Sequence, residues 1–214
     1  MRIRILYDNK ALPDFRADWG FACLLEADQT VLFDTGASPD VLRDNMEAAD
    51  VEPGAIDQIV ISHDHWDHNG GLAYLMDNND HARVFILPAF ELTVRRQVPD
   101  ERLVEVAGPR NITPSVRSSG PVPGPMSEQA VAVDSEDGKV VVTGCAHPGV
   151  DALLGKFTGR IRAVLGGFHG FSRLGALQDI PLLAPCHCTE HAEAIAERYP
   201  RQYREIMAGT VLEF

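Results

Sequence analysis

The sequence has no apolar run that approaches the ~18 residues of a membrane-spanning helix, and it is poor in positive charge. Against 31 Asp and Glu stand only 19 Lys and Arg, which gives a formal net charge of −12 over 214 residues. A field of this sign repels the phosphate backbone of nucleic acids. We therefore expect a soluble protein with no membrane or nucleic-acid partner, which acts on a small-molecule substrate. The sequence indicates no oligomeric state.

Cysteine is also scarce, with four residues in the chain. The first residues also do not show the pattern of a signal peptide. Residues 1–7 alternate basic and apolar side chains, as a strand does, without the apolar stretch and cleavage site of a signal peptide. This pattern predicts a cytoplasmic location. Two of the four cysteines, Cys186 and Cys188, flank one histidine, and we expect free thiols in a reducing compartment. The length suits a single domain, residues 1–214.

The pattern of apolar residues predicts two mixed sheets. Short runs rich in β-branched residues, bounded by turn residues, predict strands at 2–7, 21–26, 30–34, 58–62, 83–87, 130–134, 139–143, 161–165 and 210–214. Helical periodicity predicts helices at 39–49, 70–77, 89–98, 150–156 and 189–199. Strands that alternate with helices in both halves predict two packed sheets with helices outside, a four-layer αββα sandwich. The Pro- and Gly-rich segment 118–125 is either a plain linker or a loop over a site.

The strongest motif follows the strand predicted at 58–62, which runs directly into HDHWDHNGG. Three imidazoles and one carboxylate, those of His63, His65, His68 and Asp67, therefore stand just beyond a strand end. Such donors bind borderline divalent metals, most typically Zn²⁺, although iron and manganese suit them as well. A solvated histidine-rich loop would leave the adjoining apolar strand unexplained.

This HxHxDH pattern resembles the signature of the metallo-β-lactamase superfamily, and residues 31–36 are similar to the strand and turn that precede it there. Four further phrases, at 7–9, 143–149, 166–169 and 186–189, resemble the dihydropteridine-ribofuranosylaminobenzene phosphate synthase-like branch. The resemblance covers most of the chain and implies the αββα fold. The chain is shorter than that branch between His68 and His147, where substrate-binding segments tend to lie, so the resemblance does not carry the pterin substrate over.

The resemblance also implies a ligand set for two metal ions. His63, His65 and His147 would hold one ion, and Asp67, His68 and His187 would hold the second. Each set would leave an open position. Asp34 would support the site from outside the ligands, whereas the residues alone indicate only a turn carboxylate or a helix cap.

The sequence departs from the superfamily at one position. Most dinuclear members carry a bridging Asp after the strand that follows the His147 equivalent, but this chain has Gly166-Gly167-Phe168-His169 there. Loss of that anion should weaken the coupling between the metals. His169 is a candidate terminal ligand, proton donor, substrate contact or merely structural histidine. We expect Cys145, Cys186 and Cys188 to be small, partly buried packing residues. Cys145 faces the same way as His147 and is the one alternative ligand, whereas strand alternation disfavours Cys186 and Cys188.

These ligands predict a dinuclear metal-dependent hydrolase. Dications lower the pKa of bound water toward ~7, and the resulting metal-activated hydroxide would attack an ester, thioester, lactone or phosphoester. Asp67 would orient this nucleophile, and His169 is the second catalytic candidate. Two alternatives use the same ligands: an iron-dependent oxidoreductase, and a non-catalytic metal-binding sensor.

Overall fold

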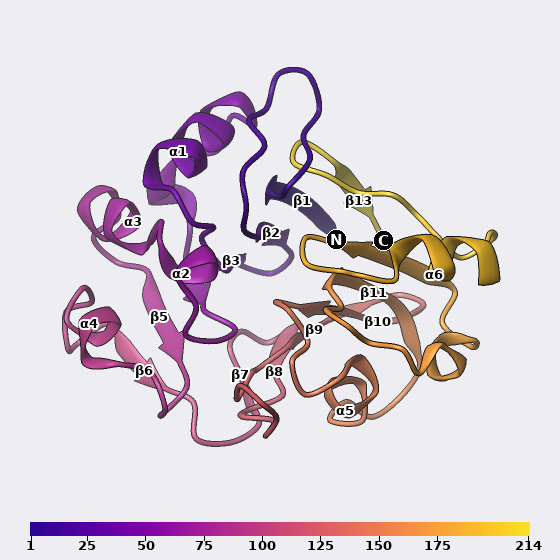
Figure 1. Cartoon of the computed structure of the whole chain (residues 1–214). Helices are drawn as coiled ribbons and strands as arrows, with labels where there is room; N and C mark the ends of the chain where they lie inside the picture. The colour runs from indigo at the N-terminus through magenta and orange to yellow at the C-terminus, as the bar shows by residue number, and fades with distance from the viewer.

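Two mixed β-sheets pack face to face in the computed structural model, which describes residues 1–214 apart from the side chain of Thr93 (Figure 1). The first sheet has the order β13-β1-β2-β3-β4-β5-β6 and the second the order β12-β11-β10-β9-β8-β7. The strands of the first are β1 (Arg2–Tyr7), β2 (Ala22–Glu26), β3 (Thr30–Phe33), β4 (Gln58–Val60), β5 (Arg83–Ile86), β6 (Leu103–Glu105) and β13 (Val211–Glu213). Those of the second are β7 (Arg110–Asn111), β8 (Val116–Ser118), β9 (Val131–Ser135), β10 (Gly138–Thr143), β11 (Ile161–Gly167) and β12 (Leu182–Cys186).

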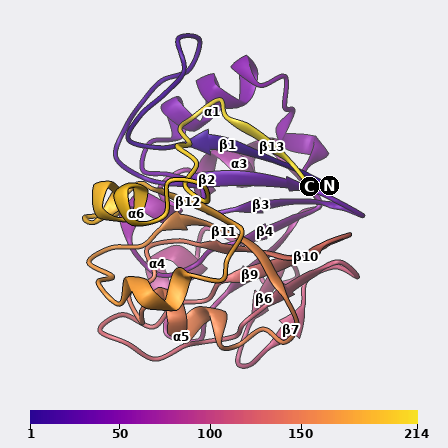
Figure 2. The ribbon, with the colours of Figure 1, turned by 90° about the vertical axis from the view of Figure 1, so that its right-hand side faces the viewer.

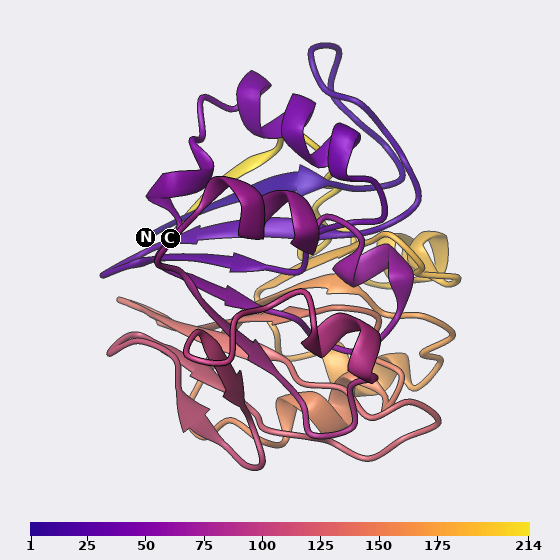
Figure 3. The same ribbon diagram turned by 90° about the vertical axis from the view of Figure 1, so that its left-hand side faces the viewer.

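Helices cover the outer faces of both sheets. Helices α1 (Pro39–Ala48) and α3 (Leu72–Asn78) cross the first sheet (Figure 3), and α1 starts where Ser38 Oγ accepts a hydrogen bond from Val41 N. The remaining helices are α2 (Trp66–Asn69), α4 (Leu92–Arg95), α5 (Val150–Leu154) and α6 (Ala192–Arg198), with 3₁₀ turns at Pro53–Ala55 and Leu174–Leu177. This arrangement confirms the predicted αββα sandwich. In the described part of the chain, no helix has the length and apolar character needed to cross a membrane.

The two faces of the second sheet bury different cores. Val140 and Val142 belong to the core between the sheets, whereas Val141, between them in β10, belongs to the core under α5 and α6. Side chains of a strand alternate between its two faces, so a sheet covered on both sides needs an apolar residue at every position. The continuous valine run of β10 meets this requirement.

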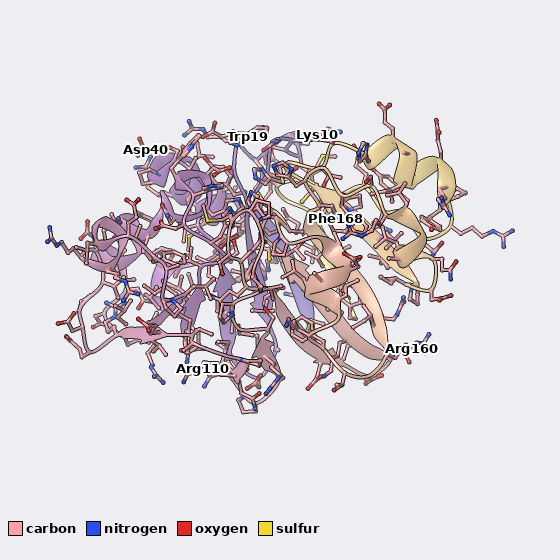
Figure 4. All side chains as sticks on the ribbon, turned by 60° about the horizontal axis from the view of Figure 1, so that its bottom comes forward. Lys10, Trp19, Asp40, Arg110, Arg160 and Phe168 are labelled. Atoms are coloured by element: carbon pink, nitrogen blue, oxygen red, sulfur yellow. The ribbon has the colours of Figure 1, made fainter. Side chains whose placement is uncertain are left out.

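The strands that lead into the site loops have their carboxyl ends at one end of the molecule. β3 and β4 are parallel neighbours, β1 runs in the same direction as β3, and β10, β11 and β12 form a parallel group. Trp19 and Lys10 lie at one end of the molecule and Arg110 and Arg160 at the other (Figure 4). The chain termini meet elsewhere, where Met1 N donates to Phe214 O at 3.1 Å (Figure 2).

Several elements differ from the sequence prediction. The helix predicted at 89–98 is reduced to α4, because its span begins beside Pro88 and ends before Pro99. Strands β6, β7 and β8, two or three residues long, were not predicted because so few residues carry no periodicity. In the segment 118–125 the first three residues are buried, while residues 123–125 form an exposed tip, so this segment is a packed connection rather than a plain linker.

Gln129 should contribute to stability because its buried side chain links the sheets. Its Nε2 donates to Ile61 O at 2.8 Å and Phe85 O at 3.3 Å, and its Oε1 accepts from Ser118 Oγ at 2.7 Å. Gln129→Leu would leave Ile61 O without a donor and the Ser118 hydroxyl without its acceptor, at about 1 kcal/mol or more each, whereas Phe85 O would keep its hydrogen bond from Ile61 N. We expect the melting temperature to fall by at least about 4 °C. Gln178→Leu, on the surface, is the matched control, and equal melting of the two variants would contradict this role.

Candidate metal centre

The histidine motif turns from β4 into the short helix α2, and the turn brings its donor atoms together. His63 and His65 precede the helix, and Asp67 and His68 lie within it. His68 O accepts hydrogen bonds from Thr35 N at 2.8 Å and Thr35 Oγ1 at 3.1 Å. The motif is therefore attached to the loop after β3, and this attachment fixes its direction.

His63, His65 and His147 form a first set of convergent donors. One nitrogen from each lies within 4.8 Å of the other two, and His63 Nε2 is 3.0 Å from His65 Nδ1. His147 comes from the loop after β10, in the other sheet. The structure thus brings together the three residues that the sequence analysis assigned to one ion.

Asp67, His68 and His187 form a second set, also within 4.8 Å of one another. His187 follows β12, and its Nε2 lies 3.4 Å from Asp67 Oδ2 without making a hydrogen bond. This nitrogen is buried and has no hydrogen-bond partner among the described residues. Buried polar atoms are almost always satisfied, so this orphan nitrogen fits a metal ligand.

Asp34 contacts one histidine of each set, directly or through Ser62. Its Oδ2 accepts from His68 Nδ1 at 2.7 Å and from Ser62 Oγ at 2.8 Å. Ser62 Oγ in turn lies 2.8 Å from His63 Nδ1. These contacts direct the Nε2 atoms of both histidines toward the other candidate donors, as in metal sites where a carboxylate orients the ligand ring. Asp34 thus lies outside the donors, where the resemblance put it.

Glu128 orients the ring of His147 in the same way, and no sequence pattern pointed to it. This fully buried carboxylate accepts from the backbone N–H groups of residues 144–147 at 2.8–3.1 Å, and its Oε2 lies 3.1 Å from His147 Nδ1. Burial would raise the pKa of Glu128, but the hydrogen bonds from His147 and the loop lower it to about 2. The only signal in the sequence is an acidic residue a few positions before the apolar strand β9.

The loop after β1 supports the second set. Asn9 Oδ1 lies 3.0 Å from His187 Nδ1, and Asp8 Oδ1 accepts from His187 N at 2.8 Å. Trp19 Nε1 donates to Asp67 Oδ2 at 2.8 Å. Asp8 and Asn9 belong to a phrase that carried the family resemblance, so that phrase was a signal for them. Nothing in the sequence distinguished Trp19.

Residues 20–180 match the family model described as the metallo-beta-lactamase superfamily, which is well over half of the chain. The chain belongs to the metallo-β-lactamase superfamily. Members of this superfamily are generally metal-dependent hydrolases. The family interpretation of the sequence is therefore confirmed.

Two proteins from Methanocaldococcus jannaschii are similar in sequence to this chain over most of its length. An uncharacterized protein, MJ0448, is 30% identical over 205 residues, covering 78% of each chain. A 7,8-dihydropterin-6-methyl-4-(beta-D-ribofuranosyl)-aminobenzene-5'-phosphate synthase is 23% identical over 268 residues, covering 94% of this chain and 91% of the synthase. The second match agrees with the branch that the four phrases indicated.

Solved structures agree with the superfamily fold. The crystal structure of Tm1679, a metal-dependent hydrolase of the β-lactamase superfamily, has a TM-score of 0.82 at 26% identity, covering 100% of this chain and 99% of that one. YhfI from Bacillus subtilis has a TM-score of 0.73 at 13% identity, covering 100% and 98%. The second likeness concerns the fold alone.

The electrostatics of the site favour the protonation states that bind metal. Burial and the neighbouring His187 lower the pKa of His68 to about 3, and burial also lowers the pKa of His63. Both imidazoles are therefore neutral at pH 7. Burial opposes ionisation of Asp67, but the adjacent His187 outweighs it and lowers the pKa of this carboxyl. Neutral imidazole and ionised carboxylate are the forms that coordinate cations.

His169 lies at the rim of the site. Its ring centroid is 5.1 Å from that of His147, its side chain is 50% exposed, and its Nδ1 is 3.7 Å from Glu190 Oε1. Among the described residues, His169 belongs to neither donor set. This position suits a proton donor or a substrate contact better than a ligand.

The cysteines differ from expectation at one point. All four are free thiols, as predicted. Cys145 and Cys188, however, have sulfur atoms within 4.8 Å of each other and of His187, although strand alternation predicted that Cys188 points away. The backbone φ of His187 is +50°, and this left-handed residue breaks the alternation just after β12 ends.

The Glu128 contacts generate a prediction for metal affinity. Glu128→Gln keeps the size of the side chain but sets an amide N–H₂ against backbone N–H donors, so the loop that carries His147 should loosen. We expect metal affinity to fall by about 10–100-fold, as for other groups that orient ligands. Competition with a chromophoric chelator measures this change.

Glu190→Gln is the matched control, because Glu190 also lies beside a histidine of the site but is 60% exposed. It should bind metal as tightly as the unmodified chain. Equal affinity of both variants would mean that Glu128 does not position His147.

Proposed function

We propose that this protein is a dinuclear metal-dependent hydrolase of a small soluble ester, thioester, lactone or phosphoester. The observation that carries the proposal is the pairing of two three-donor sets, His63, His65 and His147 with Asp67, His68 and His187. Three protein donors on each ion would leave room for water and substrate, which is typical of catalytic rather than structural sites.

The donor chemistry fits a borderline dication. Five imidazoles and one carboxylate suit Zn²⁺ best, and iron or manganese would be the alternatives. Four of the five imidazoles, all but that of His65, have their other ring nitrogen held, by Ser62, Asp34, Glu128 and Asn9. The rings are therefore oriented before an ion binds, which reduces the entropy cost of binding.

Bound dications would supply an activated water and polarise the carbonyl or phosphoryl group under attack. The chain's own contribution is orientation. Asp67 stays ionised near neutral pH because His187 lowers its pKa, and Trp19 Nε1 fixes its Oδ2. It can therefore accept a hydrogen bond from the attacking water. His169, half exposed beside His147, is the candidate for protonating the leaving group.

A cavity beside the first set is the candidate substrate site. It has a volume of about 360 Å³ and is lined by His147 and His169 together with Pro125, Phe171 and Arg173. This volume is within the range of small-ligand pockets. The apolar rim suits an acyl or alkyl group.

The guanidinium charge of Arg173 is paired with the carboxylate of Asp151. Its guanidinium makes two hydrogen bonds to Asp151, of 2.8 and 2.6 Å. Apart from the proposed metal ions, the described lining of this cavity thus offers no unpaired Lys or Arg for a phosphate. Within the proposed substrate classes, this lining favours carboxylic esters, thioesters and lactones over phosphoesters.

Metal analysis of the purified protein tests the proposal together with an ester panel. We expect close to two transition-metal ions per chain, hydrolysis of activated esters, and loss of at least one ion in His65→Ala. Elemental analysis and initial rates give both readouts. No bound metal after reconstitution would refute the proposal. Bound iron with oxygen consumption would replace it by an oxidoreductase, and a loaded protein inert toward every substrate would favour a sensor.

The assigned roles predict a ranking of two variants. Asp67→Ala removes both a donor and the group that orients water, so kcat should fall by on the order of 10⁴ or more, whereas His169→Ala should lose roughly 10²-fold with its metal retained. Steady-state kinetics and metal content compare them. Equal loss of kcat with loss of metal from His169→Ala would move His169 into the ligand set.

A further inference from the structure

The end of β11 has no space for a side chain near the metal centre. A Cβ on Gly167 would lie 2.4 Å from Gly144 O and 2.8 Å from Cys188 Sγ. Real Cβ atoms do not approach other atoms so closely, so no carboxylate can enter the centre from this position. The loops after β10 and β12 occupy the space instead, and each brings a thiol.

The sulfur of Cys145 lies between the two donor sets. It is 3.2 Å from His68 Nε2, and the donor atoms of His63, His68 and Cys145 are all within 4.8 Å of one another. The same sulfur lies within 4.8 Å of a nitrogen of His187. The Nε2 of His187 is buried and has no hydrogen-bond partner among the described residues. Cys145 thus reaches one histidine of the first set and two of the second.

The contact with His68 has the dimensions of two ligands on one ion. Zn–S and Zn–N bonds of about 2.3 and 2.0–2.1 Å in a tetrahedral arrangement separate sulfur and nitrogen by roughly 3.6 Å, close to the 3.2 Å in this structure. His68 Nδ1 is held by Asp34, so Nε2 is the atom that faces an ion. Sulfur and nitrogen therefore point at the same position.

We propose that Cys145 is a thiolate ligand of the metal centre, shared between the two donor sets where the chain lacks a bridging carboxylate. This inference rests on the proposed metal function. Coordination forms a metal–sulfur bond and releases the thiol proton to solvent. A thiolate also favours Zn²⁺ over the harder manganese ion, so the ligand bears on which metal the protein selects.

Cys188 provides a matched control. It is the neighbouring thiol, but its sulfur packs against Gly167 and lies 3.9 Å from Cys145 O. Its sulfur lies within 4.8 Å of a nitrogen of His187, but among the described residues it converges with neither His63 nor His68. Replacement of Cys188 should therefore leave the sulfur ligand in place.

Cobalt substitution tests the proposal. The full-length protein loaded with Co²⁺ should show a near-ultraviolet sulfur-to-cobalt charge-transfer band, which Cys145→Ser should lose and Cys188→Ala should retain. Retention of the band in Cys145→Ser would overturn the proposal. So would its absence from the unmodified protein with cobalt bound, which would leave the metal centre itself standing. Failure to bind any metal would instead refute the proposed function.

X-ray absorption of the zinc-loaded unmodified chain needs no variant and so does not depend on the folding of Cys145→Ser. We expect a sulfur shell near 2.3 Å beside the nitrogen and oxygen shell near 2.0–2.1 Å. A spectrum fitted by nitrogen and oxygen alone would exclude Cys145 as a ligand.

Discussion

The buried carboxylate of Asp34 is the contact on which both histidine sets depend. It accepts from His68 Nδ1 directly and reaches His63 Nδ1 through the Ser62 hydroxyl. One group thereby fixes the ring orientation of a histidine in each set. The backbone of Asp34 has a φ of +60° and is held by a 2.9 Å hydrogen bond from its N to Val60 O. Such a conformation costs on the order of 1–3 kcal/mol, and the parallel pairing of β3 with β4 supplies the support.

Glu128 repeats this arrangement on the second sheet. An unpaired buried carboxylate would cost several kcal/mol, but four backbone N–H groups and the His147 ring surround this one. Because one carboxylate supports the loops of the first sheet and the other those of the second, the donor sets meet only when the sheets pack. The valine faces of β9 and β10 in the shared core therefore determine the geometry of the site as much as the histidines do.

Local patterns in the sequence predicted the sandwich and the donors of the HxHxDH motif, because strand periodicity and a six-residue motif are local properties. His147, His187 and Asp34 came from phrases that resemble a known family. Glu128 and Trp19 could not be found in either way. Trp19 contacts Asp67 across 48 positions of sequence and Glu128 contacts His147 across 19, and no spacing rule covers contacts between loops that meet only when the strands of a sheet have paired.

The two-residue alternation of a strand predicts side-chain direction only as far as the last paired residue. Five described non-glycine residues have a positive φ, and four of them lie in the loops of the site: Asp34, Ala146, His169 and His187. Each lies within three residues of the end of a strand, where the left-handed backbone changes the direction of the chain. Because His187 follows the last residue of β12 and Ala146 lies three residues beyond β10, the cysteines beside them no longer obey a two-residue period. The two thiols therefore converge, and the same strained turns that aim the histidines bring sulfur to the centre.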